Sequence, residues 1–202
     1  MPLLDTDLSV LKTLFDVNVF AIITVTQAFA PLLIESKGTV INIGSGLGFV
    51  PFPWQGCYNA TKAAVHLITD QMRLEFLPWG INTILVVTGS VKTKFFDNLA
   101  DTPRLPQTSR YLPARDEIEP IMGGESDTAD SAIDVDKYAR AVVNNALKSK
   151  PQKHQWIGGS VWTVWLVTTF AWATFWVREN HYFLGPGNRH LLTPCRTLCF
   201  LV

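Results

Sequence analysis

A tyrosine and a lysine stand four positions apart near the middle of the chain, at Tyr58 and Lys62. Residues 58–76 predict a helix, so the two side chains share one helix face. A free phenol has a pKa of about 10 and is a poor proton carrier at neutral pH. A nearby ammonium favours the phenolate and lowers that pKa. The pair therefore suits proton exchange with an alcohol or carbonyl oxygen, although the same spacing also occurs on solvated helix faces.

A serine follows a short β-branched run, residues 39–43, and stands thirteen positions before Tyr58. The run predicts a strand buried on both faces, because Val and Ile favour strands and continuous apolar runs favour parallel sheets. Open α/β sheets bind their ligands at the carboxyl ends of such strands. We therefore expect the Ser45 hydroxyl to hold a substrate oxygen and to stabilise charge that develops on it.

Glycines alternate with other residues around Ser45, at Gly44, Gly46 and Gly48. A glycine loop that binds a pyrophosphate has to open a helix, so that its amides point at the phosphates. Residues 51–53 contain two prolines, which exclude a helix start directly after these glycines. The glycines are therefore interpreted as a tight turn that presents Ser45.

The elements around these residues alternate between helix and strand. Apolar residues recur at a helical period from Leu8 onwards, and Pro31 is expected to kink or divide that helix. After the helix of residues 58–76, residues 81–87 predict a second buried strand. The order helix–strand–helix–strand favours a parallel sheet covered by helices, and thus an α/β fold.

The second half of the chain changes character. Residues 101–130 hold four prolines and many charges, and predict a long irregular insert or a loosely helical flap over a site. Residues 135–148 predict an amphipathic helix. Residues 155–177 contain five tryptophans and no charged residue. The expected division of the chain is a partial dinucleotide-binding-type domain over 1–150, an apolar Trp-rich segment over 151–177 and an irregular tail over 178–202.

These motifs resemble those of the short-chain dehydrogenase/reductase family. The family places its catalytic serine thirteen residues before its tyrosine, after an apolar–Asn–apolar strand, and residues 40–45 and 56–64 reproduce both the motif and the spacing. Asn18 matches the family's fourth catalytic residue, an asparagine that holds a water for proton relay. The catalytic residues implied by the resemblance are Ser45, Tyr58, Lys62 and Asn18.

The resemblance also implies a Rossmann-like doubly wound parallel sheet and a nicotinamide cofactor. Where the family has Pro-Gly-x-apolar-x-Thr after its next strand, this chain has Thr88 in place of the proline. By resemblance, the Val91 backbone and the Thr93 hydroxyl contact the nicotinamide end, and Lys62 binds the adjoining ribose. The implied cofactor-binding residues are Asn18, Tyr58, Lys62, Val91 and Thr93. NADP is the expected cofactor and NAD the alternative, because the selecting position has no counterpart in the sequence.

The family's first strand and its Thr-Gly-x-x-x-Gly-x-Gly loop, which binds the pyrophosphate, have no counterpart in this sequence either. The resemblance starts at Met1, so about the first third of the fold is expected to be missing, and the remaining strands to show an unpaired apolar edge. Three explanations stay open. The chain is an incomplete part of an active reductase, a truncated protein that folds with a partner, or a catalytically impaired protein that binds a lipid surface or a partner.

Several phrases, including residues 51–60 and 86–89, are similar to a fungal branch of the family related to NADPH-dependent 1-acyldihydroxyacetone-phosphate reductase. This resemblance implies reduction of a ketone to a secondary alcohol on an apolar, lipid-like or secondary-metabolite substrate. It further implies a cytoplasmic protein associated with the endoplasmic reticulum or lipid droplets. A homo-oligomer is also expected.

Composition adds limits. Seventeen basic and 17 acidic residues balance, so no nucleic-acid partner is expected. Residues 155–177 are long enough to span a bilayer, and their tryptophans suit a membrane interface, but an apolar helix beside a substrate pocket is an equal reading. No metal is expected, because His190, Cys195 and Cys199 lack a fourth ligand and the usual short Cys spacing. His66 is expected to serve packing.

Overall fold

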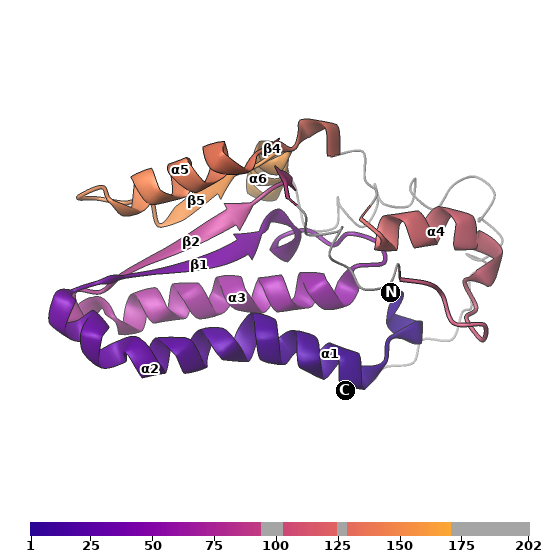
Figure 1. Cartoon of the computed structure of the whole chain (residues 1–202), viewed down its shortest axis with the longest axis horizontal. Coiled ribbons are helices and arrows are strands. Elements are labelled where there is room, and N and C mark those ends of the chain that lie inside the picture. Colours follow the sequence, from indigo (N-terminus) through magenta and orange to yellow (C-terminus); the bar gives the residue numbers. More distant parts are fainter. Residues whose placement is uncertain (94–102, 125–128, 171–202) are drawn as a thin grey trace.

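The computed structural model describes residues 1–93, 103–124 and 129–170. Its centre is a three-stranded parallel sheet in the order β1-β2-β5. The strands are β1 (Thr39–Ser45), β2 (Asn82–Thr88) and β5 (His154–Ile157). All three run in one direction, so their carboxyl ends meet at one edge of the sheet (Figure 1). The predicted α/β fold is thereby confirmed, while β5 was not among the predicted strands.

A long helical run precedes the sheet. It consists of α1 (Leu8–Phe15), a π-helical turn η2 (Asp16–Phe20) and α2 (Ala21–Ser36). The Asp7 side chain caps its start by accepting a hydrogen bond from the amide of residue 9. Pro31 does not divide the helix, because α2 continues through it. The irregularity lies earlier, in the π turn.

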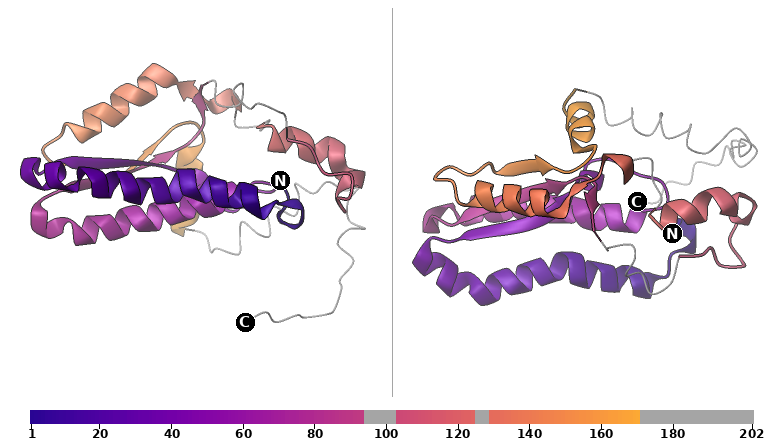
Figure 2. Two further views of the ribbon diagram at one scale, coloured as in Figure 1. Left: turned by 60° about the horizontal axis from the view of Figure 1, so that its bottom comes forward. Right: turned by 45° about the horizontal axis from the view of Figure 1, so that its top comes forward.

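Helices lie on both faces of the sheet, although they leave part of β1 uncovered. The helix α3 (Gly56–Glu75) packs on one face, where Val65 contacts Leu85 and Val87 in the main apolar core. The helix α5 (Val135–Ala146) lies on the opposite face (Figures 1 and 2). Side chains alternate across a strand, so β2 residues 85 and 87 point to α3 and residues 84, 86 and 88 point the other way. The predicted helices of residues 58–76 and 135–148 are thus confirmed.

The strand β1 is an edge of the sheet, and its outer face is partly bare. Ile41 is 37% exposed and Ile43 is 45% exposed. The prediction that residues 39–43 are buried on both faces is therefore wrong, since no described element covers the second face. The same prediction is confirmed for β2, whose five central residues are buried. The expected unpaired apolar edge is present at β1.

The predicted insert contains two short helices, η5 (Leu112–Ala114) and α4 (Arg115–Met122). Leu105, Ala114, Ile118 and Met122 form a second small core, which also contacts Met1 and Trp54. The loosely helical form of this insert is thus confirmed for residues 103–124. The remaining short elements are η1 (Leu3–Asp5), η3 (Gly46–Gly48), η4 (Leu77–Trp79), η6 (Ala129–Ser131), β3 (Val91–Lys92) and β4 (Ile133–Asp134).

The uncharged run that begins at residue 155 is not one helix in its described part. It starts in β5, turns at Gly158 and continues as α6 (Val161–Phe170). Gly158 has a φ of 124°, and a Cβ there would lie 2.5 Å from the Gly89 amide nitrogen, so only glycine fits this close approach. The expected domain boundary at residue 150 separates β5 from β2, although the two strands pair in one sheet.

Among the described residues, the helical run Leu8–Ser36 is long and apolar enough to cross a membrane. A helix that packs against other protein surfaces satisfies the same two criteria. The tail from residue 171, with His190 and two of the cysteines, lies outside the described residues.

Candidate active site

Ser45 is the last residue of β1 and lies at the carboxyl edge of the sheet, as predicted. In the parallel register it stands beside Thr88, the last residue of β2. The 3-10 turn η3 follows at once, and the Ser45 Oγ accepts a hydrogen bond from the Leu47 amide at 3.2 Å. The interpretation of the glycines as a tight turn that presents this serine is confirmed.

Tyr58 lies in the first turn of α3, with its hydroxyl beside the Ser45 side chain. Burial raises the pKa of Tyr58 above its usual value of 10.0, the Ser45 hydroxyl lowers it, and the charge of Tyr138 raises it. The phenol is therefore neutral at physiological pH and holds a proton that it can donate. Because the Leu47 amide already occupies a lone pair of the Ser45 Oγ, the serine proton is available to the Tyr58 oxygen.

Lys62 lies one helical turn after Tyr58, with its Nζ 5.6 Å from the centre of the Tyr58 ring. The Nζ donates a hydrogen bond to the Ile43 carbonyl at 3.0 Å. Burial lowers the pKa of Lys62 below its usual value. The predicted proximity of the pair is confirmed. The expected net lowering of the Tyr58 pKa is wrong for this arrangement, because burial of the phenol dominates and the ammonium is held by a strand carbonyl.

Asn18 lies in the π turn η2 and reaches α3 from the neighbouring helix. Its Nδ2 donates to the Thr61 Oγ1 at 3.1 Å, and that hydroxyl donates to the Tyr58 carbonyl at 2.8 Å. A π turn displaces carbonyl groups from the regular helical ladder and often marks a functional site. The structure therefore brings Asn18 next to the Tyr58–Lys62 turn, as the sequence predicted.

His66 continues the same face of α3, one turn beyond Lys62, and does more than pack. It is buried, its ring packs at a tilt against Phe49 with 4.4 Å between ring centres, and its Nε2 accepts a hydrogen bond from the Ser45 amide at 3.3 Å. A Cβ on Gly44 or Gly48 would lie within 2.6 Å of this ring. Both glycines are thus required for the imidazole to hold the turn that carries Ser45.

The His66 imidazole is neutral in the folded protein. Burial, followed by the charge of His154, lowers its pKa from 6.5 to about 4. Its Nδ1 is buried without a hydrogen-bond partner among the described residues, so no nearby acceptor stabilises the charged form. In addition, a protonated ring could not accept the hydrogen bond from the Ser45 amide.

Val91 and Thr93 follow β2 at the same edge of the sheet. Val91 pairs with Ile133 where β3 meets β4, which ties this segment to the start of α5. Thr88 carries a contact that the sequence did not suggest, a hydrogen bond of 2.8 Å between its Oγ1 and the Tyr138 hydroxyl. The two residues are fifty positions apart, so no local pattern could have paired them.

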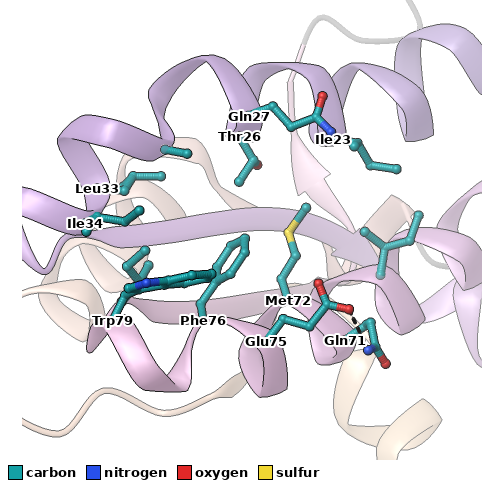
Figure 3. A pocket seen from close by; sticks show the side chains of 13 residues that line it. Ile23, Thr26, Gln27, Leu33, Ile34, Gln71, Met72, Glu75, Phe76 and Trp79 are labelled. Carbon is teal, nitrogen blue, oxygen red and sulfur yellow. Dashed lines mark hydrogen bonds between the residues drawn. The ribbon is translucent and has the colours of Figure 1, made fainter.

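A cavity of about 390 Å³ lies elsewhere, between α2 and the second half of α3 (Figure 3). Apolar side chains, among them Met72, Phe76 and Trp79, form most of its wall. None of the predicted site residues lines it. The chemistry at the carboxyl edge of the sheet and this cavity are therefore separate features.

A parallel sheet with helices on both faces and polar side chains at its carboxyl edge belongs to the class of α/β folds that bind their ligands at that edge. The family model described as short chain dehydrogenase matches residues 1–104. The chain belongs to the short-chain dehydrogenase family.

Fungal members of the family are similar in sequence. The short-chain dehydrogenase virD of Hypocrea virens is 36% identical over 177 residues, which cover 87% of this chain and 60% of that protein. An NADPH-dependent 1-acyldihydroxyacetone phosphate reductase of Schizosaccharomyces pombe is 34% identical over 117 residues, which cover 56% of this chain and 40% of that protein. The chain thus spans about 60% of the length of such relatives as virD.

Solved structures agree on the fold. A short-chain dehydrogenase from Streptomyces avermitilis superposes with a TM-score of 0.65 at 22% identity, covering 96% of this chain and 65% of its own. A second, from Sphingobium yanoikuyae in complex with NADPH, gives a TM-score of 0.57 at 18% identity, covering 100% of this chain and 63% of its own. The predicted Rossmann-like sheet is confirmed.

Acid should weaken the folded state through His66. As the pH falls from 6.5 towards 4, His66 is protonated in the unfolded chain but stays neutral in the folded chain. The free energy of unfolding therefore decreases across this pH window. His66→Gln keeps an acceptor for the Ser45 amide but cannot be protonated. The free energy of unfolding, measured with urea at pH 7 and at pH 4.5, should fall by about 2 to 3 kcal/mol less in the variant than in the wild type. Equal losses in both proteins would contradict this role.

Proposed function

We propose that this chain carries the catalytic part of an NADPH-dependent reductase that converts a ketone to a secondary alcohol. The observation that supports it most is that Ser45 lies at the carboxyl edge of a parallel sheet with Tyr58 near enough for the serine hydroxyl to lower the tyrosine pKa. Two adjacent hydroxyls, one of them a neutral phenol, suit a carbonyl oxygen that has to be oriented and protonated.

The residues present fit the nicotinamide end of such a cofactor. Lys62, Val91 and Thr93 all border the edge where Ser45 lies, and Lys62 contributes a cation there that donates to the Ile43 carbonyl. By family resemblance, these residues and Tyr58 would hold the nicotinamide and its ribose. When bound, the cofactor supplies a hydride to the ketone carbon. NADPH is proposed over NADH because the fungal reductase and the Sphingobium structure are described with NADPH.

The residues of this chain then handle the substrate oxygen and its proton. The Ser45 hydroxyl donates a hydrogen bond to the ketone oxygen and fixes its position. Tyr58, whose raised pKa keeps it protonated, donates its proton to that oxygen as negative charge develops. The positive charge of Lys62 stabilises the phenolate that remains. Asn18 contacts the helix turn that carries Tyr58 and Lys62, and by family resemblance it supports the relay that returns a proton to Tyr58.

An apolar, lipid-like or secondary-metabolite ketone is the proposed substrate. The name of the Schizosaccharomyces relative describes an acylated phosphate ester, and the other similar fungal proteins are short-chain dehydrogenases. The apolar, aromatic character of Trp156 and Phe49, whose rings stack at 5.0 Å between centres near the Ser45 turn, fits an apolar substrate.

Replacing Tyr58 by Phe removes the donated proton while keeping the ring. NADPH oxidation with an apolar ketone such as acetophenone, followed at the NADPH absorbance band, should slow by about a hundredfold or more. Binding of NADPH should persist. Tyr111→Phe is the matched control, because that ring packs on Trp54 in the second core, and it should leave turnover unchanged. Retained turnover in the Tyr58 variant would refute the mechanism.

A non-catalytic protein that binds a lipid surface is the second candidate. Trp162, Leu166 and Phe170 are exposed on α6, at 63%, 54% and 74%, in a run without charges. Tryptophan side chains suit the boundary between lipid and water, and this preference also underlies the proposed location on endoplasmic reticulum or lipid droplets in the cytoplasm.

In a flotation assay, phosphatidylcholine vesicles should carry the wild-type chain upward, and Trp162→Glu should reduce the bound fraction. Leu147→Glu, an equal change on the exposed end of α5, is the control. Vesicle binding without any NADPH fluorescence change would favour the second candidate over the reductase. A chain that stays at the bottom of the gradient would refute lipid association.

We propose that the chain forms a homo-oligomer through the solvent-exposed sides of α2 and α3, the two helices that border the cavity. Five large apolar side chains of these two helices are more than half exposed, and exposed apolar patches often mark interaction sites. They are Val25, Phe29, Leu32, Leu67 and Leu74. Light scattering should give a mass above one chain for the wild type, and Leu67→Glu should lower it while Leu147→Glu does not. A single-chain mass for the wild type would refute the proposal.

A further inference from the structure

Thr88 stands where a ligand held by Ser45 would also be within reach. The two residues are partners in the parallel register of β1 and β2, at the carboxyl ends of both strands. Residues paired in this way point to the same face of a sheet, with Cβ atoms on the order of 5 Å apart. The Thr88 side chain is thus the cross-strand neighbour of the Ser45 side chain on β2.

The Thr88 hydroxyl is held in one orientation. Its Oγ1 lies 2.8 Å from the Tyr138 hydroxyl, which fixes the choice among the few rotamers that a β-branched side chain has. Burial raises the pKa of Tyr138, so the phenol is neutral and is the more acidic donor of the two. If Tyr138 donates into this bond, the proton of Thr88 remains for a third group.

Tyr138 is itself fixed by the start of α5. Asp134 caps this helix by accepting hydrogen bonds from the amides of Asp136 and Lys137, at 3.0 and 3.1 Å. Asp134 is also the strand partner of Lys92, four residues after Thr88, where β3 and β4 pair through their backbones. The strand end and the first turn of α5 are therefore tied at two points, and the phenol cannot easily move away from the threonine.

The backbone between these two ties is rigid as well. The Gly89 amide donates to the Ile157 carbonyl at 2.8 Å, and Ser90 exchanges hydrogen bonds with Gly159. Removing the Tyr138 hydroxyl should therefore release the Thr88 side chain without displacing the strand.

We propose that Thr88, positioned by Tyr138, is a second hydrogen-bond donor of this site and binds a carbonyl-type oxygen of the ligand beside the one held by Ser45. This rests on the proposed reductase function. Two sources offer such an oxygen, the carboxamide of the nicotinamide and a second oxygen of the substrate. Tyr138 is a positioning residue, because it acts through Thr88.

The test compares Thr88→Val, which keeps the shape and removes the hydroxyl, with Thr88→Ser, which keeps the hydroxyl. Binding of NADPH is followed by its fluorescence, and binding of acetophenone to the protein saturated with NADP⁺ by calorimetry. Thr88→Val should weaken one of the two by about fivefold, the effect of one lost hydrogen bond, and Thr88→Ser should not. Weaker NADPH binding assigns the oxygen to the carboxamide. Weaker acetophenone binding alone assigns it to the substrate.

Tyr138→Phe should weaken the same ligand by about twofold to fivefold, and the double variant should match Thr88→Val alone, because both changes remove one interaction. Unchanged affinities for both ligands in Thr88→Val, or additive effects in the double variant, would overturn the proposal while leaving the reductase function intact. A wild-type chain that binds neither ligand would instead refute the reductase function on which it rests.

Discussion

The site depends on one face of α3 that is held against the end of β1. Tyr58, Lys62 and His66 follow one another at intervals of four residues, so they form a single stripe on the helix. Each contacts the last residues of the strand, through the Ser45 side chain, the Ile43 carbonyl and the Ser45 amide in turn. The stripe therefore positions the Tyr58 hydroxyl and also the backbone that carries the Ser45 hydroxyl.

The contacts of this stripe follow from the position of β1 at the edge of the described sheet. Since the Asn82 amide bonds the Gly38 carbonyl, even-numbered residues of β1 direct their backbone groups to β2 and odd-numbered residues direct theirs outward. Ile43 and Ser45 are odd-numbered, so their outward groups need partners from elsewhere. Side chains of α3 supply these partners: Lys62 donates to the Ile43 carbonyl, and His66 accepts from the Ser45 amide.

The electrostatics of the site are governed by burial more than by charge pairs. Burial is the largest influence on the pKa values of Tyr58, Lys62 and His66 alike, and in each case it favours the neutral form. A neutral phenol beside a serine hydroxyl keeps the proton that the proposed reduction requires. In that proposed reaction the cation acts only after the phenolate has formed, because only then is there a charge for it to stabilise.

The sequence by itself determined the alternation of helices and strands, the tight turn after β1 and the association of Ser45, Tyr58, Lys62 and Asn18. These follow from local periodicity, from proline and glycine chemistry and from a motif with fixed spacing. Only the tertiary structure decided that His66 holds the Ser45 amide, that Thr88 bonds Tyr138 and that residues 154–157 join the sheet. The outcome at Tyr58 was also tertiary, because desolvation depends on which distant groups exclude water. Contacts between residues far apart in the chain leave no local pattern, and it is packing that creates them.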